Sequence, residues 1–367
     1  MTSPRVRRLQ YRLLAMAGLL VLAGCVTAPP APTRPPADTR SEIVRRMPAK
    51  VADRERWAAD IETAFATQRI EPNTENICAV LAVTEQESGY VANPAVANLP
   101  KIARGEIDRR AAALHVPKFV VEAALALRSP DGRTYADRLR NVRTERDLSD
   151  IYEDMIGSVP LGKRLFADFN PVQTGGPMQV GIPFAEAHAS RYPYPIEGSI
   201  RDEVFTRRGG MYFGIAHLLG YQTPYTRKVH RFADYNAGWY ASRNAAFQSA
   251  VGIATGTTLA LDGDLLTPGA PLGKPGQTER AVRQLADALR MDDRTIREAL
   301  ERGNRLDFGD TDLYARVYAL AEARAGKPLP RAMIPGIKLE SPKITRELTT
   351  AWFATRVDER YRHCLQR

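Results

Sequence analysis

The chain has 367 residues, and its 52 Lys and Arg against 42 Asp and Glu give a formal net charge of +10 at pH 7. Four of the arginines lie in the first twelve residues, which leaves a net charge of about +6 for the rest of the chain. A modestly basic chain suits an anionic wall polymer and equally suits nucleic acid, so charge alone identifies no partner. No nucleic-acid-binding motif accompanies the charge, and we therefore expect no nucleic-acid partner.

The N-terminus has the pattern of a bacterial lipoprotein signal. A positive region precedes the apolar run 13–22, which is far shorter than the roughly 20 residues of a spanning helix. The run ends in Leu22-Ala23-Gly24-Cys25, which resembles a lipobox. Residues 1–24 are therefore predicted to be a signal peptide, with Cys25 as the lipidated first residue of the mature protein. The alternative is an ordinary signal peptide followed by a chance cysteine.

The residues after Cys25 predict where the protein lies. Val26 follows the cysteine in place of the Asp that retains many lipoproteins at the inner membrane, so we expect a lipid anchor in the outer membrane, facing the periplasm. Residues 25–40 are rich in proline and lack a hydrophobic face. They are predicted to form an extended polyproline tether.

The next two segments are predicted to be helical. Residues 41–72 form an N-terminal helical segment that is interrupted at Pro48, and Asn73 or Thr74 can cap the helix that follows. That helix should stop at Gly89, which puts Glu87 in its last turn. Glu85 lies about 200° around the same helix, and periodicity does not choose between the two carboxylates.

The rest of the chain also favours helices. Residues 95–170 read as several amphipathic helices, and another is expected over 203–219. Residues 262–277 are rich in Gly and Pro and suggest a boundary before a C-terminal helical region, 262–367, whose last helix is expected to start at Ser341-Pro342. No long strand-like alternation occurs, so the predicted class is mainly α, with at most a small hairpin.

Cysteine usage predicts one disulfide. Of the three cysteines, Cys25 belongs to the lipobox, and Cys78 and Cys364 remain in a compartment where disulfides persist. We expect these two to be joined, which would tie the C-terminus to the helix of Glu87. Two free buried thiols are the alternative, because sequence does not show proximity.

Four short motifs follow one another in the order found in one enzyme family. They are Gln86-Glu87-Ser88-Gly89-Tyr90, Gly175-Gly176-Pro177-Met178-Gln179, Arg208-Gly209-Gly210-Met211-Tyr212-Phe213 and Ala233-Asp234-Tyr235-Asn236-Ala237-Gly238. Together they resemble lysozyme-like lytic transglycosylases of the soluble type, which cleave the glycan of peptidoglycan. The resemblance implies a lysozyme-like core over 73–261 with a helical subdomain inserted at about 95–170. The chain departs from the family in this insertion and in Pro177, where the family commonly has Leu.

The resemblance also implies a mechanism and a set of site residues. Glu87 would be the single general acid and base, and its apolar neighbours and its place at the negative end of a helix should raise its pKa. The muramic acid 6-hydroxyl would then displace the leaving sugar and close a 1,6-anhydro ring, so no cofactor and no metal are expected. The residues implied in substrate binding are Ser88, Met178, Gln179, Tyr235 and Asn236.

Two alternatives to this activity stay open at the level of the sequence. The insertion could reshape the groove and leave a non-catalytic lipoprotein that binds peptidoglycan or acts as a scaffold. A muramidase that hydrolyses the same bond is the second alternative, with Asp234 or Glu203 as the second carboxylate that such chemistry uses.

Overall fold

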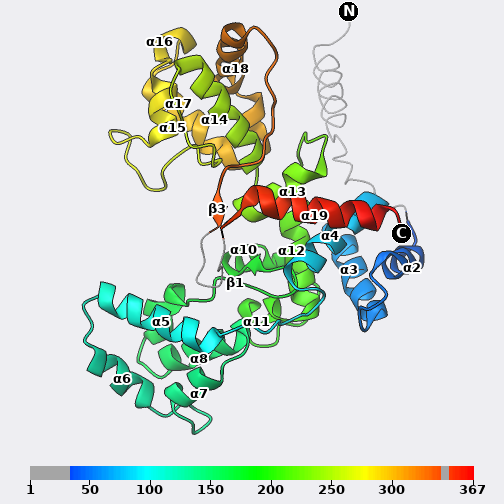
Figure 1. Cartoon of the computed structure of the whole chain (residues 1–367), viewed down its shortest axis with the longest axis vertical. Helices are drawn as coiled ribbons and strands as arrows, with labels where there is room; N and C mark the ends of the chain where they lie inside the picture. The colour runs from blue at the N-terminus through cyan, green and yellow to red at the C-terminus, as the bar shows by residue number, and fades with distance from the viewer. Residues whose placement is uncertain (1–33, 340–346) are drawn as a thin grey trace, which may run out of the picture.

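A computed structural model of the protein describes residues 34–339 and 347–367. These residues are mainly helical and include two short two-stranded hairpins, which confirms the predicted mainly α class (Figure 1). No helix within the described ranges combines the length and the apolar character needed to cross a membrane. The predicted signal peptide, the lipidation site Cys25 and most of the tether lie outside the described residues.

The N-terminal segment forms two helices, α2 (Pro36–Arg46) and α3 (Arg54–Gln68). The predicted interruption at Pro48 is confirmed, because it lies between them. The tether was expected to stay extended to residue 40, but α2 already begins at Pro36. Proline fits the first turn of a helix, where its missing N–H has no intrahelical partner, so these prolines start the helix rather than prevent it.

Helix α4 (Thr74–Glu87) is the centre of the largest hydrophobic core. Asn73 caps it by accepting a hydrogen bond from the Asn76 N–H at 2.8 Å, and every residue from 77 to 84 is buried. Helices α12 (Arg207–Leu219), α13 (Lys228–Ala237) and α19 (Thr350–Leu365) complete this core together with α3. A helix that is apolar on all sides needs such complete enclosure.

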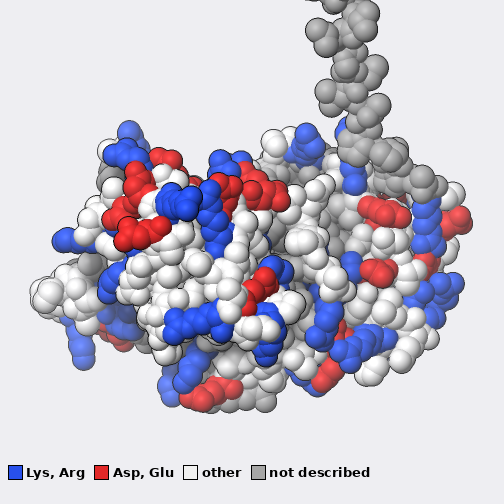
Figure 2. Space-filling view, turned by 90° about the horizontal axis from the view of Figure 1, so that it is seen from above, with Lys and Arg blue, Asp and Glu red and all other residues white. Residues whose placement is uncertain are grey.

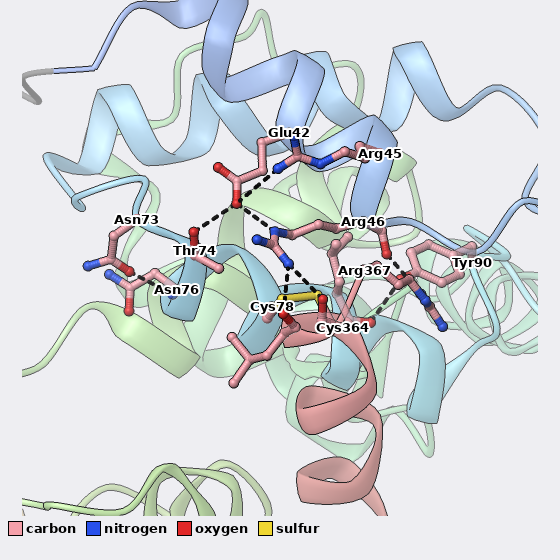
Figure 3. The surroundings of a disulfide bond; sticks show 12 residues. Glu42, Arg45, Arg46, Asn73, Thr74, Asn76, Cys78, Tyr90, Cys364 and Arg367 are labelled. Carbon is pink, nitrogen blue, oxygen red and sulfur yellow. Dashed lines mark hydrogen bonds and ion pairs between the residues drawn. A yellow bond between two sulfur atoms is a disulfide. The ribbon is translucent and has the colours of Figure 1, made fainter.

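The predicted disulfide joins α4 to α19 at the C-terminus. Cys78 and Cys364 are bonded, with their Cα atoms 5.5 Å apart, which confirms the pairing (Figure 3). The N-terminal helix reinforces this contact, since Arg46 Nη1 donates to the Cys364 carbonyl at 2.8 Å and Arg367 Nη1 donates to the Arg46 carbonyl at 2.8 Å. Residues from both ends of the described chain therefore meet on α4.

Glu42 of α2 is the buried carboxylate that organises this contact. It accepts hydrogen bonds from Arg46, from Arg34 and from the Thr74 hydroxyl at 2.8 Å (Figure 3). Burial alone would raise the pKa of Glu42, but the hydrogen bonds from Arg46, Thr74 and Arg34 outweigh it and lower the pKa to about 2. The folded state therefore favours the charged carboxylate.

We expect Glu42→Gln to lower the free energy of unfolding by about 2 kcal/mol at neutral pH. The folded pKa of about 2 lies below the ordinary value of 4.5, so the stabilisation is present above 4.5 and is lost as the pH falls towards 2. Urea unfolding at neutral pH and near pH 3 measures the effect, and the difference from wild type should shrink at the lower pH. Glu55→Gln, at an exposed position of α3, is the matched control. A loss that is equal at both pH values would contradict this role of Glu42.

The inserted segment forms a lobe of its own with a separate hydrophobic core (Figure 1). Its elements are α5 (Leu99–Ala113), α6 (Lys118–Ala126), α7 (Tyr135–Asn141), α8 (Glu145–Gly157), α9 (Gly162–Phe166) and the 3-10 turn η1 (Ala167–Phe169). The amphipathic helices predicted over 95–170 are thus confirmed in approximate position as α5 to α8, and the short α9 was not expected. The chain then returns through hairpin β1 (Thr174–Gly175) and β2 (Val180–Gly181), followed by α10 (Ile182–Ala187), η2 (Ala189–Arg191) and α11 (Ile200–Val204).

A third group of helices packs around α14 (Ala241–Thr255) in a second core. It contains α15 (Gln277–Arg283), α16 (Ala286–Leu289), α17 (Asp293–Leu300), η3 (Glu301–Asn304), η4 (Leu306–Asp310) and α18 (Asp312–Ala325). This lobe begins with α14, earlier than the boundary predicted at 262, because α14 packs on α18. The Gly- and Pro-rich stretch is a loop within the lobe.

The final helix leaves that lobe and returns to the first core. Hairpin β3 (Lys338–Leu339) and β4 (Leu348–Thr349) precedes α19, which begins at Thr350 with Thr349 as its cap. The predicted start at Ser341-Pro342 lies outside the described residues. In the view from above, basic and acidic side chains are interspersed over the visible face (Figure 2). Many charged side chains of the described residues form ion pairs, as Arg283 and Arg297 do with the buried Glu279.

Candidate active site at the end of helix α4

Periodicity did not distinguish the two carboxylates at the end of α4, Glu85 and Glu87, but the structure places them in different surroundings. Glu87 is the last residue of the helix and is partly buried. Burial raises the pKa of the Tyr235 hydroxyl far above its ordinary value, and the nearby charge of Glu87 raises it further. Burial also raises the pKa of Tyr90, and the nearby charge of Glu85 raises it further. The two carboxylates therefore face different surroundings, and Glu87 is the one beside Tyr235.

The turn of hairpin β1–β2 carries the Met-Gln motif. Gly176 and Gln179 both have positive φ, +74° and +51°, a conformation that glycine adopts readily and that a side chain disfavours. The Gln179 N–H donates to the Gly176 carbonyl at 3.1 Å, and its side-chain Nε2 donates to the same oxygen at 3.2 Å. The amide of Gln179 is thus folded onto its own turn.

Glycines of α12 allow this turn to approach the helix closely. A Cβ atom at Gly210 would lie 2.3 Å from Pro177, and one at Gly214 would lie 2.5 Å from the Met178 sulfur. Met178 is consequently 0% exposed and packs in the core. Sequence reasoning expected Met178 to form a wall of the substrate groove, but in this structure its side chain is enclosed by protein and open to no ligand.

Tyr235 connects the turn to α13. Its hydroxyl donates to the Met178 carbonyl at 2.6 Å, and the residue is buried. Asn236 is exposed, and its Oδ1 accepts a hydrogen bond from the Thr350 hydroxyl at 2.8 Å, which ties α13 to α19. Tyr235 therefore joins the β1–β2 turn to α13, and the charge of Glu87 lies close enough to act on the pKa of the Tyr235 hydroxyl.

Ser88 has a local role in ending α4. Its hydroxyl donates to the Thr84 carbonyl at 3.2 Å and accepts the Val91 N–H at 3.3 Å. Gly89 follows with a φ of +59°, and this positive φ turns the chain away from the helix. Ser88 therefore fixes the backbone directly after Glu87.

We expect Tyr235→Phe to lower the free energy of unfolding by about 1–3 kcal/mol, because the buried Met178 carbonyl would lose the partner that Tyr235 provides. Urea unfolding measures the change. Tyr194→Phe is the control, since it removes the same hydroxyl group from a tyrosine that is less buried and lies beside Arg208. Unchanged stability of Tyr235→Phe would show that this hydrogen bond does not hold the hairpin.

An aromatic cluster that the sequence analysis missed lies on the other side of Tyr235. The His217 ring is 5.0 Å from that of Tyr235 and stacks with Trp239, while Phe184 contacts both His217 and Trp239. Burial lowers the pKa of His217 to about 4, so its imidazole is neutral near pH 7. Its Nδ1 is buried and has no hydrogen-bond partner among the described residues. The sequence signal for this cluster was the position of Trp239, directly after the Tyr-Asn-Ala-Gly motif.

Asp234 and Glu203, which were considered as a second catalytic group, form hydrogen bonds within the protein. Asp234 is fully buried and accepts hydrogen bonds from the Tyr221 and Tyr225 hydroxyls and from the backbone of residues 240 and 242. Glu203 is buried and accepts from Tyr192 and from Arg208. In both cases the hydrogen-bond donors come from the protein itself.

Other charged groups near the site are also engaged. Arg207 donates to Asp60 and lies over the Trp57 ring, and Arg208 is bound to Glu203. Within the described ranges, no group of three or more His, Cys, Asp or Glu side chains is placed to hold a metal ion. Of the carboxylates named above, Glu87 is the one at the end of α4 whose charge acts on Tyr235.

Comparison with known proteins identifies a family described as "Protein of unknown function (DUF1615)", whose profile matches residues 50–367. The chain is also 56% identical over 326 residues to "Uncharacterized protein YaiW" of Escherichia coli (strain K12). That alignment covers 89% of this chain and 89% of the relative. No solved structure gives a significant match.

These matches overturn the family that the four motifs suggested. The predicted membership in the lytic transglycosylases is wrong, since the matching profile is a different one and extends over nearly all of the chain after the tether. Short strings such as Glu-Ser-Gly recur by chance, and the 89 positions between Glu87 and Gly176 were a departure from the spacing of the transglycosylases. The chain belongs to the DUF1615 family.

Proposed function

We propose that the protein cleaves the glycan strands of peptidoglycan, with Glu87 as the single general acid and base. In this proposal, α4, hairpin β1–β2, α12 and α13 form a lysozyme-like core, and a lipid on Cys25 holds the protein at the outer membrane, facing the periplasm. The observation that supports it is that Glu87 ends a buried helix and that its charge acts on Tyr235, whose hydroxyl binds the Met178 carbonyl of the β1–β2 turn.

The reaction type follows from the carboxylates that are available. A glycosidic oxygen must be protonated as it leaves, and a partly buried carboxyl at a helix C-terminus is suited to hold that proton. A hydrolase with two carboxylates needs a second group near the first. Asp234 and Glu203 already bind partners of their own. A single-acid lyase that uses the substrate's 6-hydroxyl and forms 1,6-anhydro-muropeptides is therefore the better candidate.

Digestion of purified sacculi tests the activity directly. The expected products are 1,6-anhydro-muropeptides, identified by liquid chromatography and mass spectrometry. Products with reducing ends would indicate a muramidase. Release of no fragment at acidic or neutral pH would contradict glycan cleavage altogether.

A non-catalytic wall-binding lipoprotein is the second candidate, and it too rests on a specific observation. Met178 is enclosed, Gln179 is bonded to its own turn and Asn236 to Thr350, so three expected substrate ligands have internal partners. This candidate predicts that the protein sediments with sacculi and leaves them intact. A protein that neither binds nor digests sacculi would contradict both candidates.

A further inference from the structure

The inserted lobe contains a cavity of about 590 Å³ between α5, α6 and α8. This volume lies within the range of about 300–1,000 Å³ that is usual for small-molecule sites. Its wall is largely aliphatic and comes from several helices, including Leu99, Ile102, Ile107, Val121, Leu148 and Met155. Protein interiors are normally filled at high density, so a space of this size in the middle of a lobe calls for an occupant.

The cavity has two different ends. Helices α5 and α8 start side by side, because Ala95 and Thr144, just ahead of them, are paired in a β-bridge. Leu99 therefore lines the end where both helices begin, and Arg110 and Tyr152 line the end that lies further along both helices. The cavity thus runs along the two helices from an end where the buried Glu145 is a polar residue among aliphatic ones to an end with the cation of Arg110, the carboxylate of Glu106 and the phenol of Tyr152.

Arg110 is held in place at the polar end. Its Nε donates to Glu106 at 2.6 Å and its Nη1 donates to the Phe169 carbonyl at 2.8 Å. Hydrogen bonds from Arg109 and Arg110 lower the pKa of Glu106 to about 2, so this carboxylate stays charged. Nη2 of Arg110 donates to no described residue, and the side chain lines the cavity while it stays 42% exposed, so this donor is accessible from solvent at the polar end.

Exposed apolar side chains gather on the same lobe. The Phe169 ring is 60% exposed and the Phe166 ring 43% exposed, and both residues bind the polar end through their carbonyl groups, to Arg110 and Tyr152. Large apolar residues that face solvent in this lobe also include Leu114, Phe119, Val120, Leu127, Val159 and Leu161. Such surfaces usually meet a lipid or another apolar partner.

We propose that the inserted lobe binds one long acyl chain of an anionic amphiphile. The chain would fill the aliphatic cavity and displace its weakly bound solvent, and the anionic head would accept a charge-assisted hydrogen bond from Arg110 Nη2. The exposed phenylalanines at the polar end would contact the membrane or micelle from which the amphiphile comes. This site is separate from Glu87, so it is independent of the proposed glycan cleavage.

A bulky side chain in the cavity tests the binding of the acyl chain. The full-length protein is titrated with cis-parinarate, a fatty acid that fluoresces in an apolar environment. Ala124 lines the cavity, whereas its neighbour Ala123 on α6 is exposed and does not. We expect Ala124→Phe to weaken binding at least about ten-fold, with Ala123→Phe unchanged as the matched control. Absence of binding to wild type, or equal binding by the two variants, would overturn the proposal.

The head group is tested separately, with a variant that leaves the cavity unfilled. Wild type should bind dodecanoate more tightly than dodecanol, and Arg110→Gln should remove this preference while still binding the alcohol. An equal preference in both proteins would overturn the role of Arg110. Displacement of cis-parinarate by palmitate or by lysophosphatidylglycerol then separates a free fatty acid from a phospholipid as the source. Displacement by neither would overturn the proposal.

Discussion

Loss of the disulfide is expected to lower the stability of the α4 core by about 2–5 kcal/mol. The bond closes a loop of 286 residues, and constraint of so long an unfolded chain is the main source of the stabilisation in the chain-entropy description. The double variant Cys78→Ala/Cys364→Ala should therefore unfold at a clearly lower urea concentration than the oxidised wild type.

Tryptophan fluorescence follows this unfolding, because the three tryptophans all lie in or beside the same core. Trp57 is buried in it, Trp352 packs against it, and Trp239 stacks with His217 next to Tyr235. Wild type treated with a reductant is the control, and its midpoint should move to that of the double variant. Coincident midpoints of the oxidised wild type and the variant would contradict the expected contribution of the bond.

The second large effect is expected on the rate of glycan cleavage, when the proposed general acid Glu87 is replaced. Glu87→Gln keeps the size of the side chain and cannot donate the acid proton, so the rate of muropeptide release should fall by about 10²- to 10⁴-fold. Sedimentation with sacculi and the urea midpoint should stay close to those of wild type, because the amide still fits the end of α4.

Glu85→Gln is the matched control for this variant, since it changes the same residue type two positions away on the same helix. Glu85 acts on Tyr90 and not on Tyr235, so its replacement should leave muropeptide release within about two-fold of wild type. Equal losses in both variants would point to damage of the helix. An active Glu87→Gln protein would exclude Glu87 as the general acid.

Local patterns in the sequence predicted most of the helices. Asn73 as the cap, Gly89 as the stop and the apolar residues between them are short-range signals, and α4 follows them closely. The Cys78–Cys364 pair could be predicted by elimination, because the chain has three cysteines and Cys25 was assigned to the lipobox. Helices α5 to α8 of the insertion likewise follow their own amphipathic patterns.

The packing between segments that are distant in the sequence could not be predicted from local patterns. Whether Met178 faces a ligand or the core depends on how closely α12 approaches, and two glycines of that helix settle it. The third lobe begins at α14 rather than at the predicted residue 262, because α14 and α18 share a core. A loop rich in Gly and Pro separates these two helices in the sequence. The cavity in the insertion depends on how far apart α5, α6 and α8 lie, which periodicity does not encode. The four short motifs suggested the wrong family because such strings recur by chance in unrelated proteins.

The return of α19 to the first core has a consequence for the order in which the protein can be assembled. Chains are synthesised from the N-terminus, and domains whose residues are all available fold first. The residues of the inserted lobe and of the lobe around α14, whose last helix α18 ends at Ala325, all precede α19 in the chain. The core that carries Glu87 stays open until the last residues have been made, and Cys78 has no partner until then. A nonsense mutation even a few codons before Cys364 should therefore leave two folded lobes joined to an unfinished core, a product that proteases can recognise and remove.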